Sequence, residues 1–140
     1  MAIAGTTDEV FRFEDLAAWK KARELTRGVY AISTKSGLAQ EFDLRRQMRR
    51  SAVSITSNIA EGFERAGNRE LYQFLSIAKG SCGELRSQVI IAFDQGFITE
   101  RQFHFLHDRS LELSKIIAGL MKGVRRKINE EKTKTKVRHR

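Results

Sequence analysis

The chain contains no proline and a single cysteine, Cys82, among its 140 residues. Without proline, no pyrrolidine ring interrupts a helix, so glycine and small polar residues must end each element. One cysteine excludes an intrachain disulfide, which fits a reducing compartment. Long apolar runs are also missing, and none approaches the roughly 20 residues that a membrane-spanning helix needs. Because Met1 to Thr7 also lacks the features of a secretory signal, we expect a soluble, cytoplasmic protein with no membrane contact.

Residues that carry catalysis or bind metals are scarce. The chain has three histidines, and no glutamate is followed by histidine three positions later, as a di-iron bundle would require. His104 and His107 share a helix face near Asp108, which allows only an adventitious metal site. Cys82 lies on an apolar helix face and reads as a small core residue. The sequence therefore predicts no enzyme, no cofactor and no metal centre.

The net charge of +9 is concentrated at one end of the chain. From Lys122 to Arg140 there are nine Lys or Arg and two Glu, so this segment carries a surplus of seven positive charges. The remaining residues are nearly neutral. A basic segment of this kind attracts phosphate backbones with salt-dependent affinity, or it simply improves solubility. We take Lys122, Arg125, Arg126 and Lys127 as candidate nucleic-acid-binding residues.

Helical periodicity divides the chain into four amphipathic segments, and sustained period-two alternation is absent. The clearest is the third, where Leu71, Leu75, Ala78, Cys82, Leu85, Val89 and Ala92 follow alternating spacings of four and three. Asn68 and Thr99 are candidate N-caps of the third and fourth helices, and Gly96 is a candidate stop. The pattern predicts an all-α, antiparallel, up-down-up-down four-helix bundle over residues 14–128. A flexible arm (1–13) and a basic tail (129–140) flank it.

Four arginines on the second predicted helix occupy adjacent positions on successive turns. Guanidinium groups in such a ridge can bind phosphates, or they can pair with Glu41, Asp43 and acidic residues of neighbouring helices. The nearly neutral body of the chain favours ion pairing, and phosphate binding stays the alternative. The arginines of this ridge are Arg45, Arg46, Arg49 and Arg50.

Polar residues also occur beside the apolar faces. Asn58 and Glu61 lie near the face of Ile55 and Ile59, and polar groups buried there need partners. Candidate partners are Ser81 and Glu84 on the third helix, or an arginine of the second, so we expect a polar cluster that fixes the register of the helices. The segment Lys79-Gly80-Ser81-Cys82-Gly83 places very small residues inside a helix, which implies close approach of another helix, from this chain or from a second subunit.

Several of these motifs, in this order, resemble the 23S rRNA intervening-sequence protein family, also called the S23 or four-helix-bundle family. The resemblance runs from about Phe13 to Ile98, although Thr56 stands where the family usually has proline. It is carried by the segments Phe13-Glu14-Asp15-Leu16, Trp19-Lys20-Lys21-Ala22, Gln47-Met48-Arg49-Arg50-Ser51-Ala52-Val53-Ser54-Ile55, Ser57-Asn58-Ile59-Ala60-Glu61-Gly62 and Gly80-Ser81-Cys82-Gly83-Glu84-Leu85.

The resemblance implies an antiparallel four-helix bundle that assembles in some members as a homopentamer. Some members are encoded within intervening sequences of rRNA genes, and a related group assists retroelements by binding nucleic acid and a reverse transcriptase. We therefore expect a non-enzymatic homo-oligomer that binds RNA or DNA through backbone electrostatics. The alternative is a protein–protein interaction scaffold or accessory subunit with no direct nucleic-acid role.

Overall fold

Four α-helices make up most of the computed structural model, which describes residues 12–138. They are α1 (Ala17–Lys35), α2 (Phe42–Glu64), α3 (Asn68–Asp94) and α4 (Glu100–Arg138). Short 3-10 turns, η1 (Phe13–Asp15) and η2 (Gly37–Gln40), precede α1 and α2. No β-strand occurs between residues 12 and 138. The predicted all-α class is confirmed.

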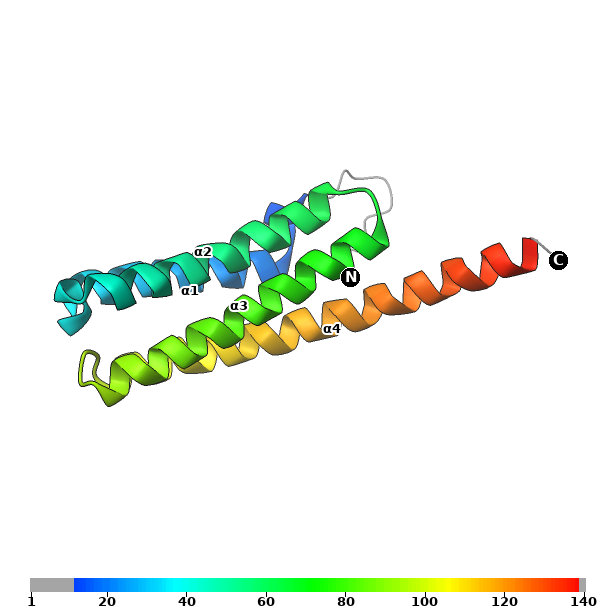
Figure 1. Ribbon diagram of the computed structural model, residues 1–140. Helices are drawn as coiled ribbons and strands as arrows, with labels where there is room; N and C mark the ends of the chain where they lie inside the picture. Colours follow the sequence, from blue (N-terminus) through cyan, green and yellow to red (C-terminus); the bar gives the residue numbers. More distant parts are fainter. Residues whose placement is uncertain (1–11, 139–140) are drawn as a thin grey trace.

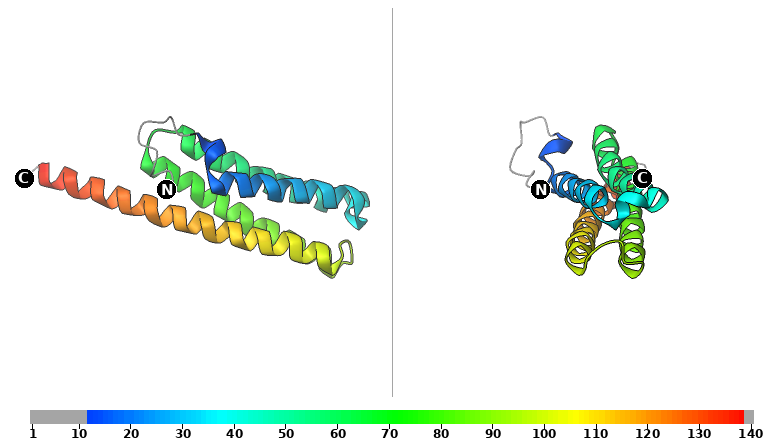
Figure 2. Two further views of the ribbon diagram at one scale, coloured as in Figure 1. Left: turned by 180° about the vertical axis from the view of Figure 1, so that it is seen from behind. Right: turned by 90° about the vertical axis from the view of Figure 1, so that its left-hand side faces the viewer.

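The helices run up, down, up and down, and each packs against its neighbours in the chain (Figure 1). The ring closes because α4 also contacts α1. Seen end-on, α1 and α2 form one layer and α3 and α4 the other (Figure 2). The outer faces of these two layers therefore point in opposite directions, which determines where each functional surface lies.

The core forms along the stripes that the spacing predicts. On α3, every residue of the predicted stripe except Leu71 is buried, and Leu71 packs at its edge. Burial of each large aliphatic side chain contributes about 1.5–3 kcal/mol. The fully buried large side chains on α2 and α4 are Met48, Ile55, Ile59, Leu106, Leu113 and Ile117.

The helix ends follow local chemistry. Thr99 and Gln102 form a capping box at the N-terminus of α4. The Thr99 Oγ1 atom accepts from the Gln102 backbone N–H at 3.1 Å, and the Thr99 backbone N–H donates to Gln102 Oε1 at 2.9 Å. Gly96, with φ of 76°, adopts the left-handed conformation after α3. These two predictions are confirmed. The prediction that Asn68 caps α3 is wrong, because Gly67 holds that position and Asn68 Nδ2 donates instead to Glu131 Oε1 at 2.6 Å.

The last helix extends past Ile128, where the apolar stripe ends, into the basic tail and continues to Arg138 (Figure 1). No glycine follows Gly123 and no proline occurs, so nothing in this segment stops a helix. Residues 129–138 are exposed throughout and project past the bundle (Figure 2). The basic tail is thus helical over these residues, while the predicted arm falls almost entirely on residues 1–11, outside the described range.

Between residues 12 and 138, no helix combines the length and the apolarity that crossing a bilayer requires.

Candidate nucleic-acid interface

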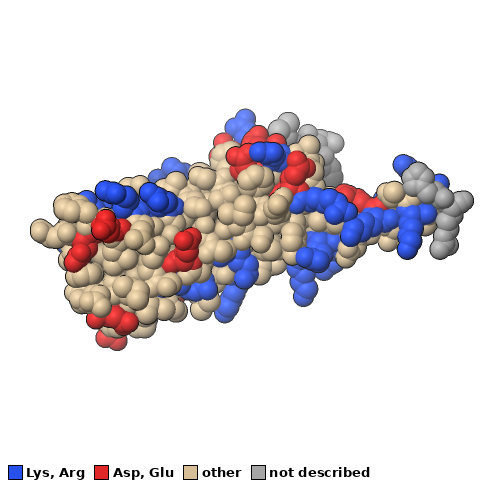
Figure 3. Space-filling model, in the orientation of Figure 1, with Lys and Arg blue, Asp and Glu red and all other residues tan. Residues whose placement is uncertain are grey.

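The eight predicted phosphate-binding cations lie on two helices that belong to opposite layers of the bundle. Arg45, Arg46, Arg49 and Arg50 are on α2, and the other four are on α4. In the space-filling view, Lys and Arg side chains gather along the projecting part of α4, with a further group over the α1–α2 layer (Figure 3). The cations therefore form two separate basic surfaces.

The four arginines of α2 line one shallow hollow of about 360 Å³ together with Tyr30, Phe42 and Val53. We call it the arginine hollow. Arg45 lies over the Phe42 ring, 4.7 Å from its centroid, and its Nη1 donates to the carbonyl oxygen of Ala39 at 2.7 Å. Stacking and this hydrogen bond fix the guanidinium at one rim of the hollow.

Arg49 is fixed by contacts with α1. Its Nε donates to Ser33 Oγ at 2.9 Å and its Nη2 to Thr34 Oγ1 at 3.1 Å, while the guanidinium lies 4.6 Å from the centroid of the Tyr30 ring. Arg46 and Arg50, each the next residue after one of these two, are exposed. The hollow therefore combines two positioned guanidinium groups with two that extend into solvent.

The expected ion pairs of this ridge are absent from the described part of the chain. Neither Glu41 nor Asp43, nor any other carboxylate between residues 12 and 138, pairs with the four arginines. The prediction of ion pairing is wrong because the neighbouring α1 offers hydroxyl groups and aromatic faces at these positions instead of acids. The positive charge of the ridge is left uncompensated.

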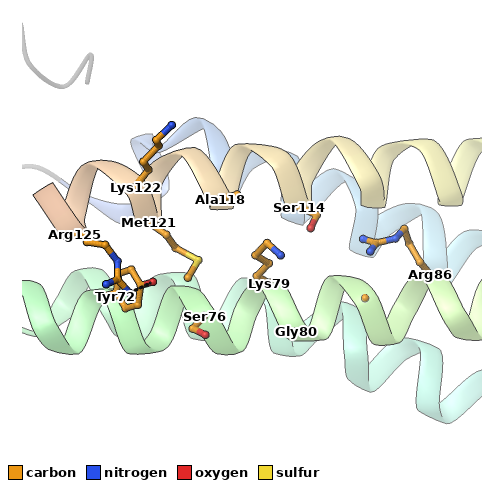
Figure 4. Close-up of a pocket in the computed structure, with 11 residues that line it drawn as sticks. Tyr72, Ser76, Lys79, Gly80, Arg86, Ser114, Ala118, Met121, Lys122 and Arg125 are labelled. Atoms are coloured by element: carbon orange, nitrogen blue, oxygen red, sulfur yellow. Dashed lines mark hydrogen bonds between the residues drawn. The ribbon is translucent and has the colours of Figure 1, made fainter.

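A second and larger hollow of about 700 Å³ lies on the outer side of the α3–α4 hairpin, with α1 and α2 behind it (Figure 4). We call it the α3–α4 groove. Four of its lining side chains are cationic and none is acidic. From α3 come Tyr72, Ser76, Lys79, Gly80, Gly83 and Arg86. From α4 come Ser114, Ala118, Met121, Lys122 and Arg125.

The cations of the groove are arranged along its length. Arg125 Nη2 donates to Tyr72 Oη at 2.5 Å at one end, and the guanidinium lies 4.6 Å from the centroid of the Tyr72 ring. Lys79 rises from α3 toward α4 in the middle, and Arg86 lies toward the other end (Figure 4). The Nη1 atom of Arg86 is buried and has no hydrogen-bond partner.

Of the four predicted cations on α4, the groove therefore includes two, Lys122 and Arg125. Arg126 and Lys127 are exposed on other faces of α4 and do not line it. Sequence reasoning missed Lys79 and Arg86, because single cations separated by two helical turns give no cluster in the sequence. Their spacing of seven residues places them on one face of α3, but their position beside Lys122 and Arg125 depends on how α3 packs against α4.

No close contact within the chain explains why glycine, and not a larger residue, occurs at several positions in and near the groove. A Cβ added at Gly80 or at Gly119 would meet no atom within 4 Å, and one added at Gly83 would meet only Arg86 Nη2 at 3.9 Å. Each helical glycine costs about 1 kcal/mol relative to alanine. The expectation that small residues mark close approach of another helix is thus wrong within this chain, and approach by another molecule stays a prediction.

The predicted polar cluster forms between α2 and α3 with a different membership. Ser54 and Ser81 share a hydrogen bond of 2.8 Å between their hydroxyls, and Asn58 Nδ2 donates to the Ser54 carbonyl at 2.8 Å and to its hydroxyl at 3.1 Å. Glu61 and Glu84 are wrongly assigned to it. Both are exposed, and Glu61 instead pairs with Arg65, the residue that follows α2, at 3.1 Å.

The buried thiol of Cys82 has a pKa raised to about 12, chiefly by loss of hydration, while the positive charges of Arg86 and Lys79 oppose the shift. A thiol with this pKa stays protonated and is a poor nucleophile. Near His107, the Nδ1 atom lies 3.2 Å from Asp108 Oδ1. Across residues 12–138, no three His, Cys, Asp or Glu residues come together as a metal site.

Comparison with known proteins accounts for this arrangement of helices. A model of the 23S rRNA-intervening sequence protein family matches residues 14–119, which is most of the chain. The chain belongs to this family. No curated protein matches it.

A solved relative supports the fold of the family. The chain is similar to the crystal structure of a protein with unknown function from the S23 ribosomal protein family of Bacteroides thetaiotaomicron, with a TM-score of 0.70 and 22% identity. The similarity covers 76% of this chain and 99% of that one. At this identity the likeness shows the fold alone.

The family match covers the two basic surfaces unequally. It includes the whole arginine hollow and the α3 side of the groove, with Lys79 and Arg86, but ends at Gly119. Lys122 and Arg125, together with the projecting part of α4, lie beyond it. The C-terminal half of α4 therefore extends the fold that the family match describes.

Proposed function

We propose that this protein is a non-enzymatic, cytoplasmic homo-oligomer that binds the phosphate backbone of RNA or DNA. One observation carries the proposal: within residues 12–138, none of the eight predicted cations on α2 and α4 is paired with a carboxylate. Unpaired cations that line shallow hollows are available to phosphates, and each phosphate contact releases counterions from the nucleic acid.

The two hollows support backbone contacts of a general kind. Positioned guanidinium groups, such as those of Arg45 and Arg49, match the geometry of phosphate oxygens. Both hollows are concave, and neither is built on the projecting part of α4, so neither can insert a helix into a major groove to read base edges. We therefore expect weak sequence preference and steep salt dependence.

The test measures fluorescence anisotropy of labelled RNA and DNA while the salt concentration rises from about 50 to about 200 mM. Arg46→Gln with Arg50→Gln should weaken binding and reduce the slope of log affinity against log salt by about two. These two arginines are exposed and make no hydrogen bond within the described chain, so their loss leaves no partner unpaired.

A matched control removes two charges elsewhere. Arg101 and Lys115 are exposed on α4 and line neither hollow, so Arg101→Gln with Lys115→Gln should change the slope far less. Equal effects of the two double variants would mean that net charge alone attracts the nucleic acid. Absence of binding by the native protein at the lowest salt would refute the proposal.

Assembly is supported by apolar side chains on the surface of α3. Ile77 and Ile91 are 48% and 47% exposed, and their separation of fourteen residues places them on one face of the helix. Exposed large apolar side chains occur where one protein contacts another, and these two are the ones that we propose to test. A second copy of the chain is the partner we propose.

The same exposed isoleucines are equally consistent with the second candidate function, a scaffold that binds a different protein and needs no nucleic acid. The two candidates differ in their response to salt. Capture of a defined partner that survives nuclease treatment and about 0.5 M salt would favour the scaffold, because charges at the surface are strongly screened under those conditions.

A further inference from the structure

The α3–α4 groove has three features that no contact within the chain explains. Four cations line it without an acidic neighbour, Arg86 Nη1 is buried without a hydrogen-bond partner, and the floor contains Gly80 and Gly83. A buried donor without an acceptor is unfavourable. Glycine inside a helix is also less stable than alanine. A ligand that supplies acceptors and needs close approach to the backbone would account for all three.

We propose that the α3–α4 groove binds the sugar–phosphate backbone of a single-stranded nucleic acid. Arg86 and Lys79 contact phosphates, and Gly80 and Gly83 leave room for the strand to lie against α3. Arg125, positioned by Tyr72, provides a further contact at the other end. This inference rests on the proposed function and assigns it a site and a class of nucleic acid.

The length of the groove favours a chain of phosphates over one small anion. Its lining on α3 extends from Tyr72 to Arg86, and fourteen helical residues rise about 21 Å. A single phosphate ion contacts only one part of that distance. A strand with regularly spaced phosphates can contact the cations at both ends and in the middle.

The shape of the groove favours a single strand over a duplex. Helices packed side by side lie about 8–10 Å apart, so the space between them is a narrow concave channel. Proteins read a duplex by inserting a protruding element into its major groove, which is about 12 Å wide. Basic channels with an aromatic side chain, here Tyr72, are typical of single-strand binding.

The glycines provide a sharp test. Gly80→Leu places a side chain in the groove, and its Cβ meets nothing within 4 Å, so the fold is retained. Gly119→Leu is the matched control, because its Cβ also meets nothing within 4 Å but Gly119 does not line the groove. The probe is a fluorescein-labelled single-stranded RNA of about 16 nucleotides, measured beside the corresponding duplex.

We expect Gly80→Leu to weaken single-strand binding about tenfold, which is about 1.4 kcal/mol, with little change for Gly119→Leu. Lys79→Gln with Arg86→Gln should reduce the salt slope by about 1.4, the value for two contacts to a single strand. Circular dichroism of each variant checks that helix content is retained. The native protein should bind the single strand more tightly than the duplex.

Four results would overturn the inference. If the native protein binds RNA but all groove variants bind equally well, the groove is not the site, and the proposed function stands on the arginine hollow. If the native protein prefers the duplex, the assignment to single strands is wrong. If Gly80→Leu changes the solution mass and not the affinity, the groove is an interface with a second copy of the chain. A native protein that binds neither probe refutes the proposed function as well.

Discussion

Ser54 and Ser81 illustrate how strongly a buried hydroxyl depends on one partner. Their 2.8 Å hydrogen bond joins α2 to α3, and Ser81 is only 5% exposed. Asn58 holds Ser54 from the other side through its amide nitrogen. A small network of neutral groups, and not of carboxylates, therefore joins the two helices.

Replacing one of the two serines should lower the free energy of unfolding by more than half of the loss caused by replacing both. Ser54→Ala leaves the Ser81 hydroxyl buried without its partner, which we expect to lower the free energy of unfolding by about 1–2 kcal/mol. Ser54→Ala with Ser81→Ala should cost less than the sum of the two single changes. Urea unfolding of the three variants measures this coupling, and strictly additive losses would contradict it.

Individual residues also show what the sequence could not predict. The residues Asn58 and Ser81 could be assigned to a polar cluster because they flank apolar stripes. The same pattern predicts that Glu84 belongs to the cluster, yet its side chain is exposed. A few tens of degrees around a helix axis separate a buried position from an exposed one, and only the packing partner fixes that rotation.

At the scale of the helix, α4 divides into a packed part and a projecting part. Val124 and Ile128 are the last buried residues, at 8% and 9% exposure, and everything from 129 to 138 is exposed. The contact from Asn68 to Glu131 ties the start of the projection to α3. The two parts should respond differently to truncation.

Ending the chain after Asn129 should leave the melting temperature nearly unchanged, because the buried side chains of Val124 and Ile128 remain. It removes five Lys or Arg and two Glu, so nucleic-acid affinity should fall and the salt slope should decrease. Ending it after Met121 should cost about 3 kcal/mol through loss of Val124 and Ile128. Thermal unfolding by circular dichroism separates the two, and equal destabilisation would contradict this division.

The helices themselves could largely be predicted, for a reason that α3 makes clear. Alternating spacings of four and three from Leu75 to Ala92 identify a buried stripe without knowledge of the partner helix. The end of α4 could not be placed, because residues 129–138 carry no apolar stripe. The helix continues through these residues because they favour helix and no stop signal occurs among them. Neither property can be read from the spacing of apolar residues.

For the whole molecule, the exposed isoleucines of α3 make assembly measurable. Ile77→Glu with Ile91→Glu should reduce the solution mass toward that of one chain, because charged groups in an apolar contact are costly to bury. Val137, which is 65% exposed near the end of α4, provides the control Val137→Glu. Sedimentation velocity gives the masses. A native protein that is already monomeric would refute the proposed assembly.

The groove shows the limit of sequence reasoning at this scale. The fold class follows from four stripes and short connections, since these allow few arrangements. Lys79, Arg86 and Arg125 come together only because α3 and α4 pack side by side at one register. No local pattern encodes that juxtaposition, so the groove is found in three dimensions alone.

The arginine hollow and the α3–α4 groove belong to opposite layers of the bundle, so a flat rigid partner reaches only one of them at a time. If both take up phosphates, one bundle can bridge two strands, or one strand that wraps around it. Titration with short strands should then saturate above one strand per chain. At low protein concentration, long strands should be drawn together into shared particles.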